Sequence, residues 1–371
     1  MGGITKGLHS NNLYSMKVLF SGGGTLGPVT PLLAMWDVIH EAHPEARAIW
    51  VGTAHGPEKV LVEKNDMLFF PIPSGKLRRY FSPLNIIDLF KIMGGLFASF
   101  RLLLSERPDI CISAGGFTSV PVHWAAWWLG IPTWIHQQDV VVGLSNRLMA
   151  RSATQITTAL EASTSQFSQK KTIWLGNPIR RDVFAGSKEN AIERFHLDSS
   201  LPLVFVTGGG TGSQRVNQLI VEAVQHLKGH AQVVHLTGRE RPQELVERAV
   251  KHFDYYHIFP FFTDEMKDAY AAADIVISRG GFGTISEIAA LGKPSILIPK
   301  PGHQEHNVAY LAKTNAAVIV DEDTADGNFL AKKIRELLEN KKERDELGKR
   351  LQALLPKAKG ADILNIFETV I

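Results

Sequence analysis

The fold is decided by the stretch Ile275–Asn307, which reads IVISRGGFGTISEIAALGKPSILIPKPGHQEHN. Ile275 to Ser278 is short, apolar and rich in β-branched residues, and glycine follows it, so it predicts a buried strand. Arg279-Gly280-Gly281 predicts a turn. The spacing of apolar residues from Thr284 to Leu291 predicts a helix that ends at Gly292.

A further strand is predicted from Ser295 to Pro299, and it leads into a polar loop at residues 302–307. A strand, a glycine turn, a helix and a second strand form a unit of an α/β fold. The polar groups of this unit gather where its strands end. Open α/β sheets bind ligands at that edge, because backbone N–H groups and the positive helix end point outward there.

The early helix carries a candidate binding pair. Glu287 lies three residues after Thr284 and therefore on the same side of the helix. The carboxylate could accept bonds from two vicinal sugar hydroxyls, the N–H and hydroxyl of Thr284 suit a phosphate, and Arg279 adds a fixed positive charge nearby. The same pair also fits a capping box, in which Thr284 caps the helix and Glu287 completes the cap. Both interpretations are open from the pair alone.

The strand–glycine–helix opening occurs once in each half of the chain. Glycine turns at Gly22–Gly27 and Gly208–Ser213 each follow a predicted strand. A length of 371 residues also exceeds the usual size of one domain. We therefore predict an α/β protein with two Rossmann-like domains facing across a cleft. The predicted divisions are an extension at residues 1–15, an N-terminal domain at 16–178, a C-terminal domain at 179–355, and a helix at 356–371 that packs back on the first domain.

The first glycine turn resembles a dinucleotide-binding motif but lacks its acidic partner. Gly22, Gly24 and Gly27 match the G-x-G-x-x-G pattern after a strand. A nicotinamide site also needs an acidic residue at the end of the next strand, and here Val51 leads into Gly52. This argues against a nicotinamide cofactor, and we predict no cofactor. The turn instead allows close approach of a phosphate or of another backbone segment.

Composition excludes several classes of protein. The chain has 40 Lys and Arg against 37 Asp and Glu, a net charge of +3, which is too balanced for a general nucleic-acid binder. Its single cysteine, Cys111, lies in an apolar run and cannot form an internal disulfide, which fits a reducing cytosol. Residues 1–15 lack the apolar core of a secretory signal.

In the segment Gly75–Arg107 the apolar positions are too dense for a helix with one buried stripe, and basic residues flank them. It opens with Lys76, Arg78 and Arg79, and its longest apolar run, Ile92 to Leu104, is too short and too interrupted to span a bilayer. Two interpretations are open: the segment rests on an anionic membrane surface, or it packs against the sheet or a neighbouring subunit. A following predicted helix, Val120 to Leu129, carries three tryptophans expected to lie in the core with an interfacial edge.

Taken together, these motifs make the chain resemble the MurG family of bacterial peptidoglycan N-acetylglucosaminyltransferases, which have the GT-B fold and belong to glycosyltransferase family 28. The resemblance runs from Met16 onward. It is carried, in order, by GGGTLGPVTPLLA, AGGFTSVPVHWAAWWLGIP, HQQDVVVGLSN, GNPIRRDVF, VTGGGTGSQRVNQ, FFTDEM, SRGGFGTISEIAALGKP and HQEHN. One glycine loop alone would be weak evidence, whereas this ordered set is specific.

The resemblance implies an inverting, metal-independent transfer of N-acetylglucosamine from UDP-N-acetylglucosamine to the muramyl sugar of an undecaprenyl-pyrophosphate-linked muramyl-pentapeptide. It implies peripheral attachment to the cytoplasmic face of the membrane, with the Gly75–Arg107 segment facing the anionic surface, and no nucleic-acid partner. By analogy the donor would bind Thr25, Leu26, Gly27, Asp139, Arg180, Gly210, Phe262, Thr263, Arg279, Phe282, Gly283, Thr284, Ile285, Ser286, Glu287 and Gln304. The acceptor, with its pyrophosphate on backbone N–H groups, would bind Gly23, Gly24, Gly115, Gly116 and Asn146.

Departures from the family pattern affect the expected general base. The first loop of the family ends Gly-Gly-His, whereas here Pro28 follows Gly27, so an imidazole often proposed as the base is missing. The His-Glu-Gln-Asn cluster of the family appears here as His136-Gln137-Gln138-Asp139. An inverting transfer to a hydroxyl needs a proton acceptor within reach, and Asp139 or His136 could supply it. An equally open alternative is that Asp139 only makes structural hydrogen bonds.

Other functions share most of these features. A UDP-sugar transferase with another lipid acceptor would have much the same donor half. A UDP-N-acetylglucosamine 2-epimerase would also have two Rossmann-like halves, but it would consume the UDP-sugar without any lipid. A degenerate UDP-sugar-binding protein would bind UDP and transfer nothing.

Overall fold

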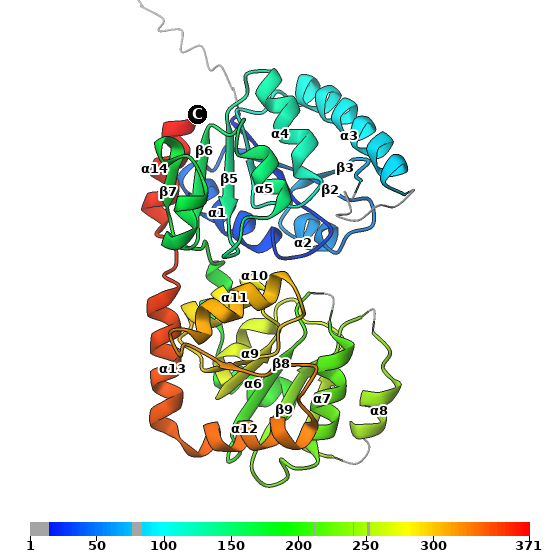
Figure 1. Ribbon diagram of the computed structural model, residues 1–371, viewed down its shortest axis with the longest axis vertical. Helices are drawn as coiled ribbons and strands as arrows, with labels where there is room; N and C mark the ends of the chain where they lie inside the picture. Colours follow the sequence, from blue (N-terminus) through cyan, green and yellow to red (C-terminus); the bar gives the residue numbers. More distant parts are fainter. Residues whose placement is uncertain (1–14, 76–83, 211, 240, 251–252) are drawn as a thin grey trace, which may run out of the picture.

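The computed structural model describes residues 15–75, 84–210, 212–239, 241–250 and 253–371. The predicted extension, apart from Ser15, and the basic residues Lys76, Arg78 and Arg79 lie outside the described residues. The chain forms two α/β lobes stacked one above the other (Figure 1). Each lobe is built around its own sheet, in agreement with the predicted fold class.

The first lobe contains a parallel seven-stranded sheet of order β3-β2-β1-β4-β5-β6-β7. Its strands are β1 Lys17–Ser21, β2 Arg47–Gly52, β3 Leu68–Pro71, β4 Ile110–Ser113, β5 Thr133–Gln137, β6 Gln155–Thr158 and β7 Thr172–Trp174. Its helices are α1 Val29–Ala42, α2 Glu58–Lys64, α3 Leu84–Glu106, α4 Ser119–Trp128 and α5 Leu144–Met149. Short 3₁₀ helices follow at Glu161–Gln166 and Gln169–Lys171, and a third, Arg181–Ala185, packs against the helix Met266–Ala272 of the second lobe.

The second lobe contains a parallel six-stranded sheet of order β10-β9-β8-β11-β12-β13. Its strands are β8 Leu203–Thr207, β9 Gln232–Leu236, β10 Tyr256–Phe259, β11 Ile275–Ser278, β12 Ser295–Leu297 and β13 Val318–Ile319. Its helices are α6 Lys188–Phe195, α7 Gln214–Val224, α8 Glu244–Val250, α9 Met266–Ala272, α10 Phe282–Ala290, α11 His303–Ala312, α12 Gly327–Glu339 and α13 Lys341–Leu354. The last helix, α14, spans Gly360–Val370.

Both faces of the second sheet are buried, as a parallel sheet requires. Along β8, Leu203 and Phe205 belong to one apolar core, whereas Val204 and Val206 belong to the core on the opposite face. Successive strand residues point to opposite faces, so one continuous apolar run supplies both cores. The sheet is thereby held between two helical layers, and the carboxyl ends of its strands point toward the first lobe (Figure 1).

One of the two open interpretations of the Thr284–Glu287 pair, the capping box, is excluded by the structure, and one prediction about the segment 275–307 was wrong. Helix α10 begins at Phe282, and Gly281 precedes it without any side-chain cap, so Thr284 is not a capping residue. The predicted polar loop at residues 302–307 is instead the start of helix α11. Gly302 reverses the chain at a φ of 103°, and its N–H donates to the Glu305 carboxylate at 2.7 Å, which stabilises the start of that helix.

The C-terminal helix α14 lies on the first lobe, although α13 before it runs along the second (Figure 1). Ile363, Ile366 and Phe367 are buried in the apolar core that α1 shares with the first sheet. A single β-bridge between Asn177 and Lys357 lies where the chain returns to that lobe. The two lobes are therefore joined by two chain crossings rather than one.

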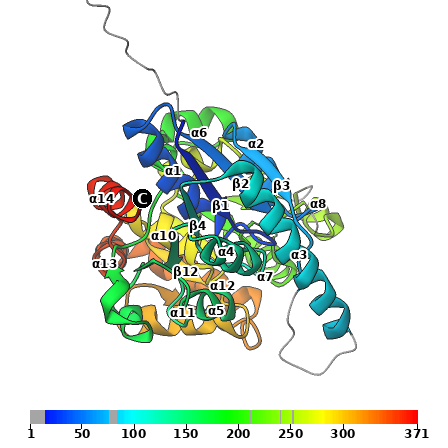
Figure 2. The same cartoon turned by 90° about the horizontal axis from the view of Figure 1, so that it is seen from above.

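Helices α3 and α4 pack together on the outer side of the first lobe (Figure 2). The Gly94-Gly95 pair does not interrupt α3. A Cβ atom on Gly95 would lie 2.3 Å from the Pro73 carbonyl oxygen, so glycine here permits a close approach of the backbone. The expectation of core tryptophans was wrong for Trp127 and Trp128, whose side chains are exposed. Within the described chain, no helix is both long and apolar enough to cross a membrane.

Candidate active site

A cavity of about 700 Å³ lies between the carboxyl ends of the two sheets. Glycine turns of the first lobe line one side, and β8, α10 and α11 line the other. Ion pairs join the lobes at the margins, between Lys64 and Asp264 and between Arg181 and Glu41. The cavity therefore collects the ends of strands that are far apart in the sequence.

Most residues predicted to bind ligands do line this cavity. On the donor list these are Thr25, Leu26, Gly27, Asp139, Arg180, Gly210, Phe262, Thr263, Arg279, Phe282, Gly283, Thr284, Glu287 and Gln304. All five residues on the acceptor list, Gly23, Gly24, Gly115, Gly116 and Asn146, also line it. Ile285, Ser286 and His136 do not line it, and all three are buried. Ile285 belongs to the apolar core beneath α10, because the helix turns that position away from the cavity.

Glu287 is held in place by two partners on neighbouring elements. Its Oε1 accepts from Arg180 Nη2 at 3.4 Å, and its Oε2 accepts from the Tyr270 hydroxyl at 3.1 Å. Burial raises the pKa of Glu287, and the positive charge of Arg180 acts against that rise. Tyr270 was missed by the sequence analysis, because a single tyrosine in an apolar helix carries no binding signal.

The start of α10 presents unpaired N–H groups to the cavity. The N–H of Ile285 donates to Gly281, as the first bond of the helix, and the three N–H groups before it have no intrahelical partner. Gly283 lies against α1 of the first lobe, since a Cβ atom there would be 3.2 Å from Thr30 Oγ1. An anion at this point would meet the positive end of the helix dipole.

Arg279 lines the cavity but already has protein partners. Its guanidinium forms an ion pair with Glu322 and donates to the Ile298 carbonyl at 3.1 Å. Gln304, also on the predicted donor list, accepts from the Lys300 N–H at 2.9 Å. Both side chains are thus oriented by the second lobe itself.

Aromatic residues close the donor side of the cavity. Phe262 is buried and stacks on Phe195 with ring centroids 5.0 Å apart, so its ring belongs to the core of the lobe. Phe261 also lines the cavity, and the Arg239 guanidinium lies 4.7 Å from its ring centroid. The sequence analysis missed Phe261, although the Phe261-Phe262 pair placed it beside a predicted site residue.

The first glycine loop is braced by a buried carboxylate that the sequence analysis also missed. Glu58 accepts from the Gly24 N–H at 3.2 Å and from the N–H and hydroxyl of Thr53 at 2.7 and 2.6 Å. The Gly22 N–H donates to the Val51 carbonyl. Gly22 and Gly24 are therefore not free to bind a phosphate through their N–H groups, whereas those of Gly23 and Thr25 have no acceptor among the described residues.

Glycine is also required where the two lobes approach each other across the cavity. A Cβ atom on Gly210 would lie 2.6 Å from Leu26 Cδ1. This contact gives a physical reason for glycine at position 210. On the other side, Pro28 stands directly before α1 and lines the cavity.

Asp139 lies at the junction of the lobes. Its Oδ1 accepts from Asn307 Nδ2 at 2.8 Å, and the Val140 N–H donates to Asn307 Oδ1 at 3.1 Å. Burial raises the pKa of Asp139, while the hydrogen bond from Asn307 and the charge of His303 act in the opposite direction. A carboxylate with a raised pKa is better suited to accept a proton near neutral pH.

His136, the other candidate base, does not reach the cavity. It is fully buried, and its two ring nitrogens bond to Thr157 Oγ1 at 2.9 Å and Asn177 Oδ1 at 3.0 Å. Burial lowers its pKa to about 4. The structure therefore argues against His136 as the base, because both nitrogens already have partners in the interior.

Three polar atoms on or beside the wall are buried without any hydrogen-bond partner among the residues that the structure describes. They are Asn146 Oδ1, Arg180 Nε and Ser286 Oγ. The first two belong to residues that line the cavity, where a ligand could satisfy one acceptor and one donor. In the part of the chain that the structure describes, no cluster of three or more His, Cys, Asp or Glu side chains could hold a metal ion.

Two parallel-sheet lobes around such a cavity are the arrangement of GT-B glycosyltransferases. The profile of the glycosyltransferase family 28 N-terminal domain matches residues 18–158, and that of the C-terminal domain matches residues 203–362. The chain belongs to glycosyltransferase family 28, as the sequence motifs indicated.

Among its relatives is the UDP-N-acetylglucosamine–N-acetylmuramyl-(pentapeptide) pyrophosphoryl-undecaprenol N-acetylglucosamine transferase of Clostridium botulinum strain Langeland. The two are 33% identical over 330 residues, which cover 88% of this chain and 92% of the relative. The crystal structure of MurG from Acinetobacter baumannii matches with a TM-score of 0.71 and 23% identity, covering 95% and 99% of the two chains. A UDP-GlcNAc 2-epimerase from Neisseria meningitidis bound to UDP-GlcNAc matches with a TM-score of 0.67 and 14% identity, covering 95% of this chain and all (100%) of that one. Transferases and epimerases thus share the fold, and the sequence relationship separates them.

Proposed function

We propose that this chain transfers N-acetylglucosamine from UDP-N-acetylglucosamine to the muramyl sugar of undecaprenyl-pyrophosphoryl-N-acetylmuramoyl-pentapeptide, a step of peptidoglycan synthesis. The relationship to the named transferases supports this choice over the epimerase and over other lipid acceptors. The structural observation that carries it is the buried carboxylate of Glu287, one helical turn beyond the open N-terminus of α10 on the wall of the cavity. That pairing suits a ribose joined to a diphosphate.

The donor half supplies the matching groups. The unpaired N–H groups at the start of α10 would bind the diphosphate, and the free Nε of Arg180 would add a charged donor. A carboxylate offers about four lone-pair positions. Arg180 and Tyr270 use one on each oxygen of Glu287, so the remaining positions suit a vicinal diol.

The acceptor half consists of two glycine turns in contact. Gly115 and Gly116 adopt φ values of 105° and 94°, and a Cβ atom on Gly116 would lie 3.2 Å from the Gly23 nitrogen. Only glycine adopts such conformations without strain, and it leaves room for a phosphate to approach the backbone. The unpaired Asn146 Oδ1 beside Gly115 would accept a hydrogen bond from a hydroxyl group of the acceptor.

We assign the role of proton acceptor to Asp139. The muramyl hydroxyl oxygen would attack the anomeric carbon as its proton passes to Asp139, while the bond from that carbon to the UDP oxygen breaks with inversion. The start of α10 would stabilise the charge that develops on the departing diphosphate.

The exposed face of α3 and α4 is proposed to rest on an anionic membrane surface. Phe90, Met93 and Phe97 follow one another at helical spacing on α3 and are 70%, 61% and 74% exposed. Trp128 of α4 is 67% exposed, and its ring lies 5.5 Å from that of Phe100 on α3, so the apolar face is continuous across both helices. Such a surface, with aromatic rings and nearby cations such as Lys91, suits the lipid interface. We therefore propose that the chain is a peripheral protein of the cytoplasmic membrane face.

A transfer assay tests the proposed function. Radiolabelled UDP-N-acetylglucosamine is incubated with the muramyl-pentapeptide lipid in detergent, and the label in the lipid product is measured. Label in that product, dependent on the acceptor, is the expected result. Consumption of the donor without acceptor would instead indicate an epimerase, and UDP binding without any transfer would indicate a degenerate binding protein.

A further inference from the structure

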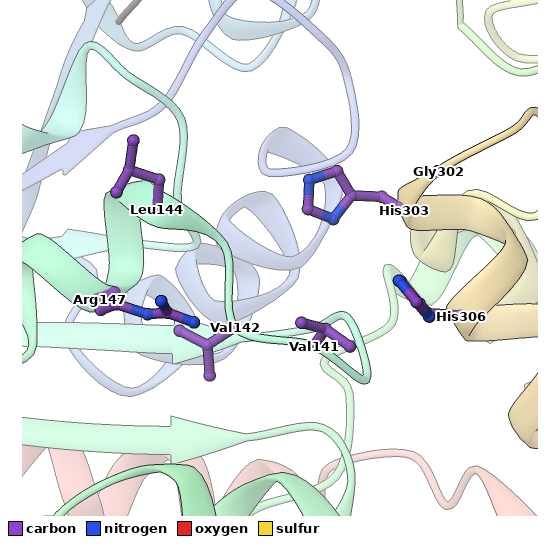
Figure 3. A pocket seen from close by; sticks show the side chains of 7 residues that line it. All are labelled: Val141, Val142, Leu144, Arg147, Gly302, His303 and His306. Atoms are coloured by element: carbon purple, nitrogen blue, oxygen red, sulfur yellow. The ribbon is translucent and has the colours of Figure 1, made fainter. Parts of the chain in front are cut away.

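A second, smaller pocket opens beside the interlobe cavity. Its volume is about 330 Å³, at the lower end of the range for small-molecule sites. It is lined by Val141, Val142, Leu144, Arg147, Gly302, His303 and His306. In Figure 3, His303 and His306 extend from α11 toward a space that Leu144, Val142 and Arg147 border on the opposite side.

The polar lining of this pocket is basic. Arg147 comes from α5 of the first lobe, and His303 and His306 come from the first turns of α11 in the second lobe. No carboxylate in the described part of the chain lies within ion-pair distance of these three side chains. The nearby acids are otherwise engaged, since Glu305 binds the Gly302 N–H and Asp139 binds Asn307. The pocket therefore offers a ligand one guanidinium and two imidazoles that have no ion-pair partner among the described residues, although the charge of His303 also acts on Asp139.

The rest of the lining is apolar. Val141 and Val142 come from the segment that connects β5 to α5, and Leu144 is the first residue of α5. A phosphate group alone would gain nothing from these apolar side chains. A ligand that has both an anionic group and aliphatic carbon would use both parts of the lining, and a peptide with a free carboxylate has this chemistry.

The pocket also lies where a substituent of the acceptor sugar would leave the main cavity. Leu144 and His303 line both pockets, so the two spaces adjoin. Asn146, two residues after Leu144, lies against the Gly115 turn proposed to hold the acceptor. A sugar that spans from that turn to Asp139 would direct its substituents past Leu144.

We propose that this side pocket binds the carboxylate-bearing peptide of the acceptor, with Arg147 and His306 as its specificity-determining residues. The proposal rests on the proposed function. The planar guanidinium of Arg147 would pair with a peptide carboxylate through two parallel hydrogen bonds, and the peptide's aliphatic groups would pack on the two valines. Residues of both lobes contribute, so the acceptor peptide would also bridge the lobes when bound.

The test compares two acceptors in the full-length enzyme. One carries the pentapeptide with its free carboxylates, and the other carries the same peptide with every carboxylate amidated. The variants are Arg147→Gln and His306→Gln. Arg151→Gln is the matched control, because Arg151 is an exposed arginine four residues after Arg147, beyond the end of α5 and outside both pockets. The donor KM reports whether each variant is folded.

We expect Arg147→Gln to raise the KM for the free-carboxylate acceptor about tenfold, the effect of one charge-assisted hydrogen bond. The KM for the amidated acceptor and the donor KM should not change, and His306→Gln should act in the same direction. Equal KM values for the two acceptors in the wild-type enzyme, or a free-carboxylate KM that Arg147→Gln leaves unchanged, would overturn the proposal while leaving the proposed function intact. A failure to transfer the sugar to either acceptor would refute the proposed function itself.

Discussion

Replacing Glu287 by glutamine tests the donor site most directly. Glutamine keeps the length of the side chain and one carbonyl acceptor, but it removes the negative charge. Arg180 retains a second carboxylate partner in Asp182, at 3.2 Å, so no arginine charge is left buried without a partner. We therefore expect the variant to fold, with its effect concentrated on ligand binding.

The size of the effect follows from the hydrogen bonds of the carboxylate. A hydrogen bond to a charged group contributes about 1.5–3 kcal/mol. Loss of one such bond to the ribose corresponds to roughly 10- to 150-fold weaker binding, at about 1.4 kcal/mol for each factor of ten. Both the Kd for UDP, measured by calorimetry, and the donor KM should rise by such a factor.

The pH dependence adds a second signature of this residue. Burial raises the pKa of Glu287, and the ribose bonds need its ionised form. Wild-type affinity for UDP should therefore fall as the pH decreases through that raised pKa, at a higher pH than an ordinary glutamate would cause. Glu287→Gln should lose this dependence.

The matched control is Glu244→Gln, an exposed glutamate on α8 outside the cavity. It should leave the Kd for UDP unchanged. A Kd for UDP in Glu287→Gln within about twofold of wild type would refute the assignment, since one charged hydrogen bond is worth more than that.

Three further outcomes are expected. Asp139→Asn should lower kcat by about 10²- to 10⁴-fold, the usual contribution of a general base. It should also remove the acid limb of the pH–rate profile, which lies at a higher pH in the wild type because burial raises the pKa of Asp139. Near-normal turnover would leave Asp139 a structural residue. The double substitution Phe97→Ser and Trp128→Ser should weaken binding to anionic vesicles at least about tenfold, since burial of one such side chain contributes about 1.5–3 kcal/mol. The kcat measured in detergent should stay unchanged. Vesicle binding equal to that of the wild type would place the membrane contact elsewhere. Glu58→Gln should lower the free energy of unfolding in urea by about 1–3 kcal/mol and should raise the KM for the acceptor. An unchanged acceptor KM would show that the first glycine loop does not need the hydrogen bonds of Glu58 to bind the acceptor.

The fold class could be predicted from the sequence because it follows from local patterns, and the family resemblance supplied many of the residues that line the cavity. Short apolar runs that end in glycine predicted the strands, and the two repeated openings predicted two lobes. In parallel sheets such turns gather at one edge, so the glycine turns and Glu287 meet at one cavity. The motifs were also specific enough to indicate the family, which the comparisons confirmed.

The tertiary structure decided which of these residues are available and which have protein partners. Glu58, on the helix that follows the next strand, accepts a hydrogen bond from the Gly24 N–H. Asn307 of the second lobe donates a hydrogen bond to Asp139 of the first. His136 was a plausible base by sequence, yet its strand directs it into the interior between Thr157 and Asn177. The basic side pocket draws Arg147 and His306 from different lobes. Periodicity and motif spacing describe neighbours along the chain, whereas burial and hydrogen bonding depend on neighbours that only the packing of the lobes brings together.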